Sequence, residues 1–347
     1  MRYTIEDVAK EANVSISTVS RVLNNNYPVK KETRQRIEEA IKKLDYKPNP
    51  LARGLVSGKS NIIGVLVPNL KSLIYTEMIS FIEYRLSQNG YDVMITTTNS
   101  NREEEEEAIK RFLNRSVDGI IIIETELLRD DEFLKSVMGK TPVLFVNEHN
   151  EKTNNVYVDN KEAVKNVLDY VLNLGHTKVA IAYEKGNKVH EECLKHYNEF
   201  ASEQEIYPMI VGIDPDDLDD EKVDVLEKSL DDSYELGKDI TAFIVCDDLV
   251  MLRVFRGIYK RNLSIPKDIS IINLKNTALS KMLHPTISTI DISPDKIAES
   301  VTNKIIYLLK NKEYKIEGEK IYTGIIERES CRSIIRRPKK DMEEYFL

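Results

Sequence analysis

The sequence contains few cysteines, no long hydrophobic run and no apolar segment at its start. Its three cysteines, Cys193, Cys246 and Cys331, are far apart and form no C-x-x-C pair. This pattern favours free thiols in a reducing cytoplasm over a disulfide framework or a zinc site. The longest apolar runs, such as GIIIIE at 119–124, suit buried strands and are too short to span a membrane. Because MRYTIEDVAK lacks the features of a signal peptide, we expect a cytoplasmic protein.

Motifs that would indicate an enzyme are also missing. Neither G-x-G-x-x-G nor G-x-x-x-x-G-K-[S/T] occurs, so a nucleotide-dependent enzyme has no support. No nucleophile–base pair or metal-ligand cluster stands out, and the run REEEEE at 102–107 fits the acidic start of a helix. We therefore expect no catalytic site, no cofactor and no bound metal.

Charge is distributed unevenly along the 347 residues. The chain carries a net charge of −8, which by itself argues against nucleic acid as a partner. Residues 1–60, however, hold 12 Lys and Arg against 7 Asp and Glu, a net charge of +5, so the remainder carries −13. This asymmetry predicts a small basic module attached to a larger acidic body, and the length predicts two or three domains.

The basic segment has the pattern of three short helices. Thr4 can cap a first helix over 5–12, and Asn13 can adopt the left-handed conformation of a tight turn. Ser15 can cap a second helix, and a third helix is predicted over 31–44. Two helices joined by a tight turn and braced by a third form a helix-turn-helix module.

The second helix of this module is unusually rich in hydroxyl groups. In a helix-turn-helix, the second helix lies in the major groove of DNA with its N-terminal residues at the base edges. Ser and Thr hydroxyls there can donate to phosphate oxygens, and Arg21 can pair with guanine or phosphate. We interpret the stretch VSISTVSRVLNNN at 14–26 as a DNA-recognition segment rather than a solvated surface helix.

A linker follows, and then a repeating pattern of strands and helices. Pro48 and Pro50 end the third helix, and 51–56 can form only one or two marginal helical turns. Apolar runs then alternate with amphipathic segments, which predicts parallel strands covered by helices on both faces. The predicted strands are 62–68, 91–98, 117–124, 142–148, 155–160, 178–183, 242–248, 269–274 and 286–292. The predicted helices are 74–89, 102–114, 160–174, 189–204, 218–237, 249–262 and 294–311. So many strands predict two sheets, with ligands at their carboxyl ends.

These motifs together resemble the LacI–GalR family of bacterial transcriptional repressors. The resemblance is strongest in TIEDVAKEANVSISTVSRVLNN and VKKETRQRIEEAIKKLDYKPNPLARGL, and it continues through IIGVLVPN, RSVDGIIII, YVDN, LGHTKVAIA, TAFIVCDD and HPTISTI in order. It implies an all-α helix-turn-helix head joined by a hinge helix to an α/β core. That core would consist of two parallel-sheet subdomains of the periplasmic-binding-protein-like type I fold.

The resemblance also implies domain boundaries. It implies a DNA-binding domain at 1–47, a hinge at 48–60, an effector-binding and dimerisation core at 61–335 and a tail at 336–347. The N-subdomain would comprise 61–157 and 276–290, and the C-subdomain 158–275 and 291–335. The tail lacks a leucine heptad, so we expect a homodimer rather than a tetramer held by a coiled coil.

Roles for individual residues in DNA binding follow from the same resemblance. The positions that match base-reading residues are Ile16, Ser17 and Arg21. Those that match contacts to the DNA backbone are Thr4, Ser15, Thr18, Ser20, Asn24, Thr33, Tyr46 and Asn49. Leu55 matches a leucine that wedges between bases in the minor groove, a contact that would bend the duplex at a flexible step.

The implied effector pocket departs from the family's sugar-binding pattern. Its expected residues are Asn69, Tyr75, Asp159, Cys193, Asp247 and Lys275. The ligand-gripping arginine expected after LGHTKVAIA is missing, with Cys193 near its place, and Lys275 replaces an aspartate. Because these losses remove groups that satisfy sugar hydroxyls, a simple neutral sugar is disfavoured. An anionic effector facing Lys275, a different neutral ligand and no small molecule at all remain open.

The sequence thus predicts a DNA-binding transcriptional regulator, most often a repressor, that binds a pseudo-palindromic operator as a dimer with an effector of unknown identity. The stretch NTALSKMLHP at 276–285 is similar to catabolite-control members, which use a phosphorylated carrier protein as corepressor, so a protein corepressor is an alternative partner. A small-molecule-binding protein without DNA function is the rival from another class.

Overall fold

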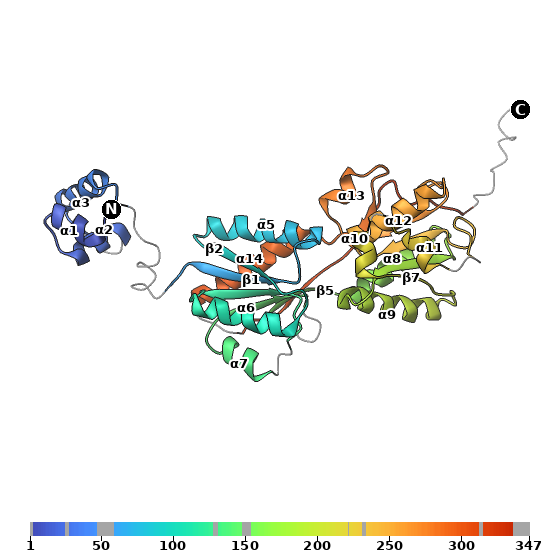
Figure 1. Ribbon diagram of the computed structural model, residues 1–347, viewed down its shortest axis with the longest axis horizontal. Coiled ribbons are helices and arrows are strands. Elements are labelled where there is room, and N and C mark those ends of the chain that lie inside the picture. The colour runs from blue at the N-terminus through green and yellow to red at the C-terminus, as the bar shows by residue number, and fades with distance from the viewer. Residues whose placement is uncertain are drawn as a thin grey trace, which may run out of the picture. The chain divides into compact units, whose positions relative to one another are not determined.

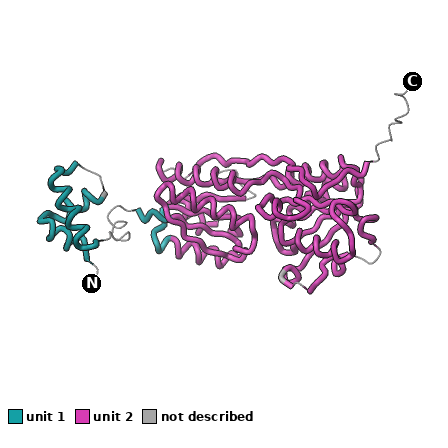
Figure 2. Tube along the Cα trace, turned by 90° about the horizontal axis from the view of Figure 1, so that it is seen from above, with its two compact units in different colours: residues 1–62, 113–118 teal, residues 63–112, 119–347 magenta. Residues whose placement is uncertain are grey.

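The computed structural model describes residues 3–24, 28–46, 59–127, 131–147, 154–220, 222–230, 234–311 and 315–335, and all their side chains except those of Asn24 and Asp219. The chain divides into two compact units, shown in Figure 2. One comprises 1–62 with 113–118, and the other comprises 63–112 with 119–347. None of the helices in the described part is long and apolar enough to cross a membrane.

The first unit contains the predicted three-helix head. Its helices are α1 (Ile5–Glu11), α2 (Ile16–Asn24) and α3 (Lys31–Lys43). The capping box predicted at the start of α1 is confirmed: Thr4 Oγ1 accepts from the Asp7 amide at 3.3 Å, and Asp7 Oδ2 accepts from the Thr4 amide at 2.8 Å. Asn13 adopts a φ of +51°, so it makes the left-handed turn expected between α1 and α2.

A small apolar core holds the head together. Its buried residues come from all three helices: Val8, Ala9, Ala12, Val19, Val22, Ile37 and Ala40. Ser15 Oγ accepts from the Thr18 amide at 3.2 Å and so satisfies one of the unpaired N–H groups at the start of α2. Within each helix the buried apolar residues recur mostly at three- and four-residue spacing, as an amphipathic helix requires.

The second unit contains two six-stranded sheets. The first has the order β11-β5-β4-β3-β1-β2, and the second has the order β12-β10-β9-β8-β6-β7. In the first sheet the strands are β1 (Ile62–Val67), β2 (Asp92–Thr97), β3 (Gly119–Ile123), β4 (Val143–Val146), β5 (Asn155–Val158) and β11 (Glu319–Ile321). In the second they are β6 (Val179–Glu184), β7 (Met209–Ile213), β8 (Ala242–Val245), β9 (Ser270–Asn273), β10 (Ser288–Ile290) and β12 (Ile325–Ile326). The pairings β1–β3, β3–β4, β4–β5 and β5–β11 are parallel, as are β6–β7, β6–β8, β8–β9 and β9–β10, whereas β12 runs antiparallel to β10.

Helices cover both faces of each sheet (Figure 1). Around the first sheet these are α5 (Leu73–Gln88), α6 (Arg102–Asn114), α7 (Glu132–Met138) and α14 (Pro294–Asn311). Around the second they are α8 (Asn160–Asn173), α9 (Lys188–Glu203), α10 (Pro215–Asp219), α11 (Val225–Ser229), α12 (Asp248–Lys260) and α13 (Ala278–Met282). Along β6, Val179 and Ile181 join the core that contains α8 and α9, whereas Ala180 and Ala182 join the core that contains α11 and α12. This alternation explains why the strands read as continuous apolar runs.

The predicted subdomain boundaries are wrong for the last part of the chain. β10 and β12 lie in the second sheet, whereas β11 lies in the first sheet and α14 packs against α5. We therefore define the first lobe as 63–158 with 294–321, and the second lobe as 159–292 with 325–335. The expected placement of 276–290 with the first lobe and of 291–335 with the second is corrected accordingly. An apolar strand pattern shows that a strand is buried but not which sheet it joins.

Two other elements differ from the sequence prediction. The single helix expected over 218–237 is replaced by α10 and α11, because Pro215 starts the first and Asp224 caps the second by accepting from the Leu226 and Glu227 amides. The short strands β7, β11 and β12 were not predicted. They contain only two to five residues, which is too few for a clear periodic signal.

Candidate functional site

The exposed side of α2 carries the three predicted base-reading residues. Ile16, Ser17 and Arg21 are exposed, and Ile16 leaves 45% of its surface open. Ile16 can therefore offer an apolar contact to a partner surface. Thymine methyl groups in the major groove are one such apolar surface.

Hydroxyl groups cluster at the start of α2. Ser15 Oγ lies 2.8 Å from both Ser17 Oγ and Thr18 Oγ1. Such groups can exchange these mutual hydrogen bonds for bonds to phosphate oxygens, at a helix end whose dipole favours anions.

The other predicted backbone contacts are distributed over the head. Thr4 is exposed at the start of α1, and Ser20 and Thr33 are half-buried. Tyr46 packs against the head core after α3. Asn49 and Leu55 lie outside the described residues, as does the side chain of Asn24.

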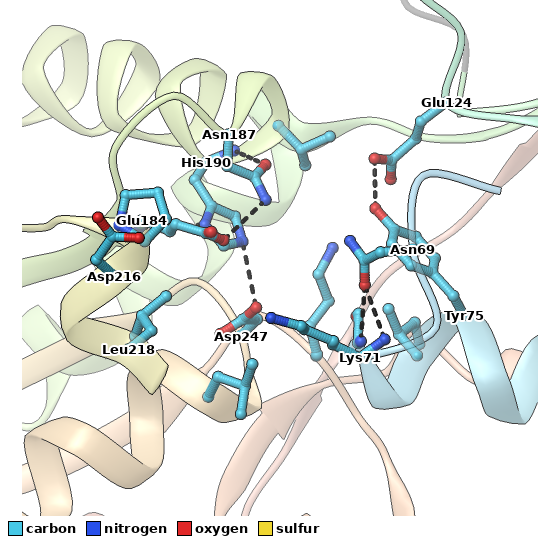
Figure 3. Close-up of a pocket in the computed structure, with 16 residues that line it drawn as sticks. Asn69, Lys71, Tyr75, Glu124, Glu184, Asn187, His190, Asp216, Leu218 and Asp247 are labelled. Atoms are coloured by element: carbon cyan, nitrogen blue, oxygen red, sulfur yellow. Dashed lines mark hydrogen bonds and ion pairs between the residues drawn. The ribbon is translucent and has the colours of Figure 1, made fainter. Parts of the chain in front are cut away.

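A cavity of about 210 Å³ lies between the two lobes, where strand ends converge (Figure 3). From the first lobe, Asn69 follows β1 and Glu124 follows β3. From the second lobe, Glu184 ends β6, Asp247 follows β8 and Lys275 follows β9. The carboxyl ends of five parallel strands thus surround the cavity, as the doubly wound pattern predicts.

On the first-lobe side, two residues are fixed by hydrogen bonds. Asn69 Oδ1 accepts from the amides of Lys71 at 2.9 Å and Ser72 at 3.0 Å, which holds the loop before α5. The Tyr75 hydroxyl donates to the Glu124 carboxylate (Figure 3). Burial raises the pKa of Tyr75 well above its ordinary value, and the charge of Glu124 adds to the effect.

On the second-lobe side, His190 is held in one orientation. Its Nδ1 accepts from the Glu184 amide at 3.2 Å, so the proton of the neutral ring resides on Nε2. Nε2 lies 3.8 Å from Asp247 Oδ2, while Asp247 Oδ1 caps α12 by accepting from the Val250 amide at 2.9 Å. The pKa of His190 is lowered to about 4, chiefly by burial; the charge of Asp247 opposes this shift and that of Lys275 contributes to it. The ring is therefore neutral at physiological pH.

Glu184, His190 and Asp247 also raise the question of a metal site, because their ligand atoms lie within 4.8 Å of one another. A metal needs a ring nitrogen with a free lone pair. The Nδ1 lone pair accepts the Glu184 amide and Nε2 carries the proton, so the ring in this orientation offers no lone pair. The arrangement fits hydrogen bonding and does not fit a metal ion.

Four of the six predicted pocket residues, Asn69, Tyr75, Asp247 and Lys275, line this cavity. The other two do not, and their placement in the pocket is corrected. Asp159 caps α8 by accepting from the Glu162 amide at 3.1 Å, and it pairs with Lys320 at 2.9 Å.

Cys193 is buried one turn beyond His190 on α9, inside the core, because α9 begins at Lys188 and only its first turn borders the cavity.

Sequence reasoning missed Glu124, Glu184 and His190. The two glutamates directly follow or end apolar runs, which is the signal that could have indicated them.

Beside the cavity, a hydrogen bond joins the two lobes. Glu77 on α5 accepts from the amide of Ala278, the first residue of α13, at 2.8 Å.

Nearby, Asp248 is 4% exposed and accepts from Asn273 Nδ2 at 3.0 Å. The pKa of Asp248 is raised to about 7, chiefly by burial; the charges of Asp247 and Glu77 act in the same direction and the hydrogen bond from Asn273 opposes them.

This buried carboxyl group gives a pH-dependent prediction. The pKa of Asp248 is about 7 in the folded chain and near 3.8 when unfolded, so only the folded state keeps the proton between these values. Stability contributed by this residue is therefore lost as the pH rises from about 4 to about 7. We expect Asp248→Asn to raise the free energy of unfolding by about 2 to 4 kcal/mol at pH 8 and to change it little at pH 4.

Urea unfolding of the full chain between pH 4 and 8 tests this. Asp169→Asn is the matched control, because Asp169 is exposed and pairs with Lys165 on the surface of α8. The control should change stability only slightly at every pH. An equal effect of Asp248→Asn at pH 5 and pH 8 would contradict the assigned titration.

Comparison with known proteins covers both units. Residues 4–49 match the family described as bacterial regulatory proteins, lacI family, and residues 168–331 match the periplasmic binding protein-like domain. Catabolite control protein A of Priestia megaterium is 31% identical over 319 residues, covering 90% of this chain and 94% of that protein. The protein of the same name from Staphylococcus xylosus is 27% identical, covering 84% of this chain and 87% of that protein.

Among solved structures, the lac repressor dimer bound to operator and the anti-inducer ONPF has the same fold. It aligns with a TM-score of 0.80 at 22% identity, covering 96% of this chain and all of that chain. A helix-turn-helix head and a two-lobed binding core in one chain define a DNA-binding transcriptional regulator. The chain belongs to the lacI family of bacterial regulatory proteins.

The rival interpretation, a small-molecule-binding protein without DNA function, does not account for the head. The relatives matched over most of this chain are regulators rather than enzymes.

Proposed function

We propose that this regulator represses transcription in the bacterial cytoplasm as a homodimer, with two heads on a pseudo-palindromic operator. The observation that carries the proposal is the exposure of Ile16, Ser17 and Arg21 on one side of α2 in the head. A helix-turn-helix dimer places two such helices about one turn of DNA apart. The lac repressor structure, which is a dimer bound to operator, supports the assembly.

In the proposal, Ile16, Ser17 and Arg21 read bases, and the remaining set contacts the DNA backbone. That set is Thr4, Ser15, Thr18, Ser20, Asn24, Thr33, Tyr46 and Asn49. Leu55 of each protomer would enter the minor groove at the central step and open it, at an unstacking cost that is least at flexible pyrimidine–purine steps.

The cavity between the lobes is the proposed effector site. It is lined by residues of both lobes, and the lobes are joined at its edge by the Glu77–Ala278 hydrogen bond. A ligand that binds the closed arrangement more tightly than the open one shifts the lobes toward closure. Closure would change the separation of the two hinges in the dimer and so the affinity for operator.

Selection of bound sequences from a random DNA library with the full-length protein tests the core of this proposal. We expect enrichment of a pseudo-palindrome, and loss of sequence preference would refute the assignment. Arg21→Ala should weaken binding to the selected site by about 10- to 100-fold, since a bidentate base contact contributes about 1–3 kcal/mol.

Arg21→Lys is the matched variant, because it keeps the charge and removes the planar fork. It should retain affinity for random DNA and lose most of its preference for the selected site. If both variants weaken the two kinds of DNA equally, Arg21 does not read a base.

A second candidate is regulation by a protein corepressor, which rests on the similarity of NTALSKMLHP at 276–285 to catabolite-control members; the two relatives are named catabolite control protein A. Such a partner would raise operator affinity without occupying the cavity. Asp247→Asn, which alters the cavity wall, would then leave the response to the partner intact.

A further inference from the structure

The wall of the cavity carries more negative than positive groups. Four carboxyl side chains line it, from Glu124, Glu184, Asp216 and Asp247, and two lysines do, Lys71 and Lys275. In a concave site with low-dielectric walls, such an excess concentrates ligands of the opposite sign. We propose that the cavity takes a small organic cation, an amine that also carries hydroxyl groups, in the manner of an amino sugar.

This inference rests on the proposed effector site and adds the chemical class of its ligand. It differs from the anionic effector that Lys275 suggested in the sequence. The charges of Asp247 and Lys275 both act on the His190 ring, so the two side chains are close to each other. An anionic ligand at Lys275 would therefore lie beside the Asp247 carboxylate and be repelled by it. A cation instead meets carboxylates from both lobes, Glu124 on one side and Glu184 and Asp247 on the other (Figure 3).

Lysines of the adjoining space do not reverse this balance. A second cavity of about 510 Å³ shares Glu124 and Glu184 with the first, and Lys185 and Lys188 line it. Lys185 pairs with Asp214 at 3.1 Å, and Lys188 pairs with Glu126. Their charges are therefore already matched by carboxylates of their own.

The hydroxyl requirement comes from His190 and Asp247. The His190 side chain is 4% exposed, and its Nε2–H has no hydrogen-bond acceptor within 3.5 Å among the described residues. His190 lines the cavity, so a ligand there that supplies an acceptor to this donor gains affinity. Asp247 Oδ2 lies 3.8 Å from Nε2, a separation too long for a direct hydrogen bond.

A ligand hydroxyl placed between the two atoms would accept from Nε2–H and donate to Oδ2. Because the ring is neutral and held by the Glu184 amide, this donor–acceptor pair is fixed before a ligand arrives. An ammonium group on the same ligand would then be close to the carboxylates. The combination of hydroxyl and amine distinguishes the expected ligand from a neutral sugar and from a simple polyamine.

Thermal unfolding of the full-length protein with four matched probes tests the inference. Glucosamine, N-acetylglucosamine, glucose and glucose 6-phosphate share a ring and differ in charge. We expect glucosamine at about 20 mM to raise the melting temperature of the core by about 3 °C or more. The neutral and anionic probes should change it by less than a third of that amount.

Two variants show whether the shift arises in the cavity. Glu184→Gln and Asp247→Asn each remove one charge while keeping shape, and Asn can still cap α12. Each should reduce glucosamine affinity by about tenfold. Glu199→Gln is the control, because Glu199 lies on α9 outside both cavities and pairs with His196 at 3.0 Å. It should leave the shift unchanged.

The outcomes separate this inference from the proposed function. A shift of equal size with glucose or glucose 6-phosphate overturns the charge class, as does the absence of any shift with glucosamine, even if operator binding is intact. A glucosamine shift that survives Glu184→Gln and Asp247→Asn also overturns it. Specific stabilisation by glucosamine in a protein that binds no operator would refute the regulator proposal and support the ligand class.

Discussion

Operator affinity will fall by about a thousandfold or more when monovalent salt rises from about 50 to about 200 mM, the expected result for about 6–10 phosphate contacts. The physical reason is release of counterions: each phosphate neutralised by Lys or Arg frees condensed cations, and added salt opposes this release. The net charge of −8 for the whole chain does not prevent this, because residues 1–60 alone carry a net charge of +5. A dimer brings two such segments to one duplex.

Fluorescence anisotropy with a labelled operator measures the slope of log affinity against log salt. Its control is the melting temperature of the core in the same buffers, which shows whether salt acts on the protein itself. A slope near zero would contradict DNA binding through the basic segment.

The same titration discriminates between two roles of Arg21. If its guanidinium reads a base, Arg21→Ala lowers affinity and leaves the slope nearly unchanged. If it contacts phosphate, the slope falls by about one for each head.

The head could be predicted from the sequence almost completely, because its determinants are local. The capping pair of Thr4 and Asp7, the left-handed Asn13 and the spacing of apolar residues all act within a few positions of one another. Long, strongly periodic helices such as α14 were predicted with the same bounds that the structure shows. In these segments, local propensity and the final packing agree.

The arrangement of the lobes could not be predicted in the same way. β10 and β11 are short, and their partners, β9 and β5, are set by the path of the whole chain. The cavity shows the same limit: Asn69, Tyr75, Asp247 and Lys275 were inferred from family resemblance, whereas His190 was missed. Its role depends on a hydrogen bond to the Glu184 amide and on burial, and neither leaves a mark in the sequence.

The second large effect is expected from Ile37→Ala in α3. Ile37 is completely buried, and seven buried apolar residues form the head core in the described part of the chain. Truncating a buried isoleucine costs about 2–5 kcal/mol, which is comparable to the whole stability of so small a core. We therefore expect the head to unfold in a large fraction of molecules and DNA affinity to fall by about 10- to 1000-fold. The loss should affect operator and random DNA alike.

Ile16→Ala is the matched comparison, because it removes the same atoms from an exposed position. It should change the stability of the head by less than about 0.5 kcal/mol and weaken operator binding more than binding to random DNA. Calorimetry should show the transition of the core unchanged in both variants, since the core is a separate compact unit. If Ile37→Ala keeps full affinity, the packed head is not the form that binds DNA. If it also lowers the core transition, the two units do not unfold independently.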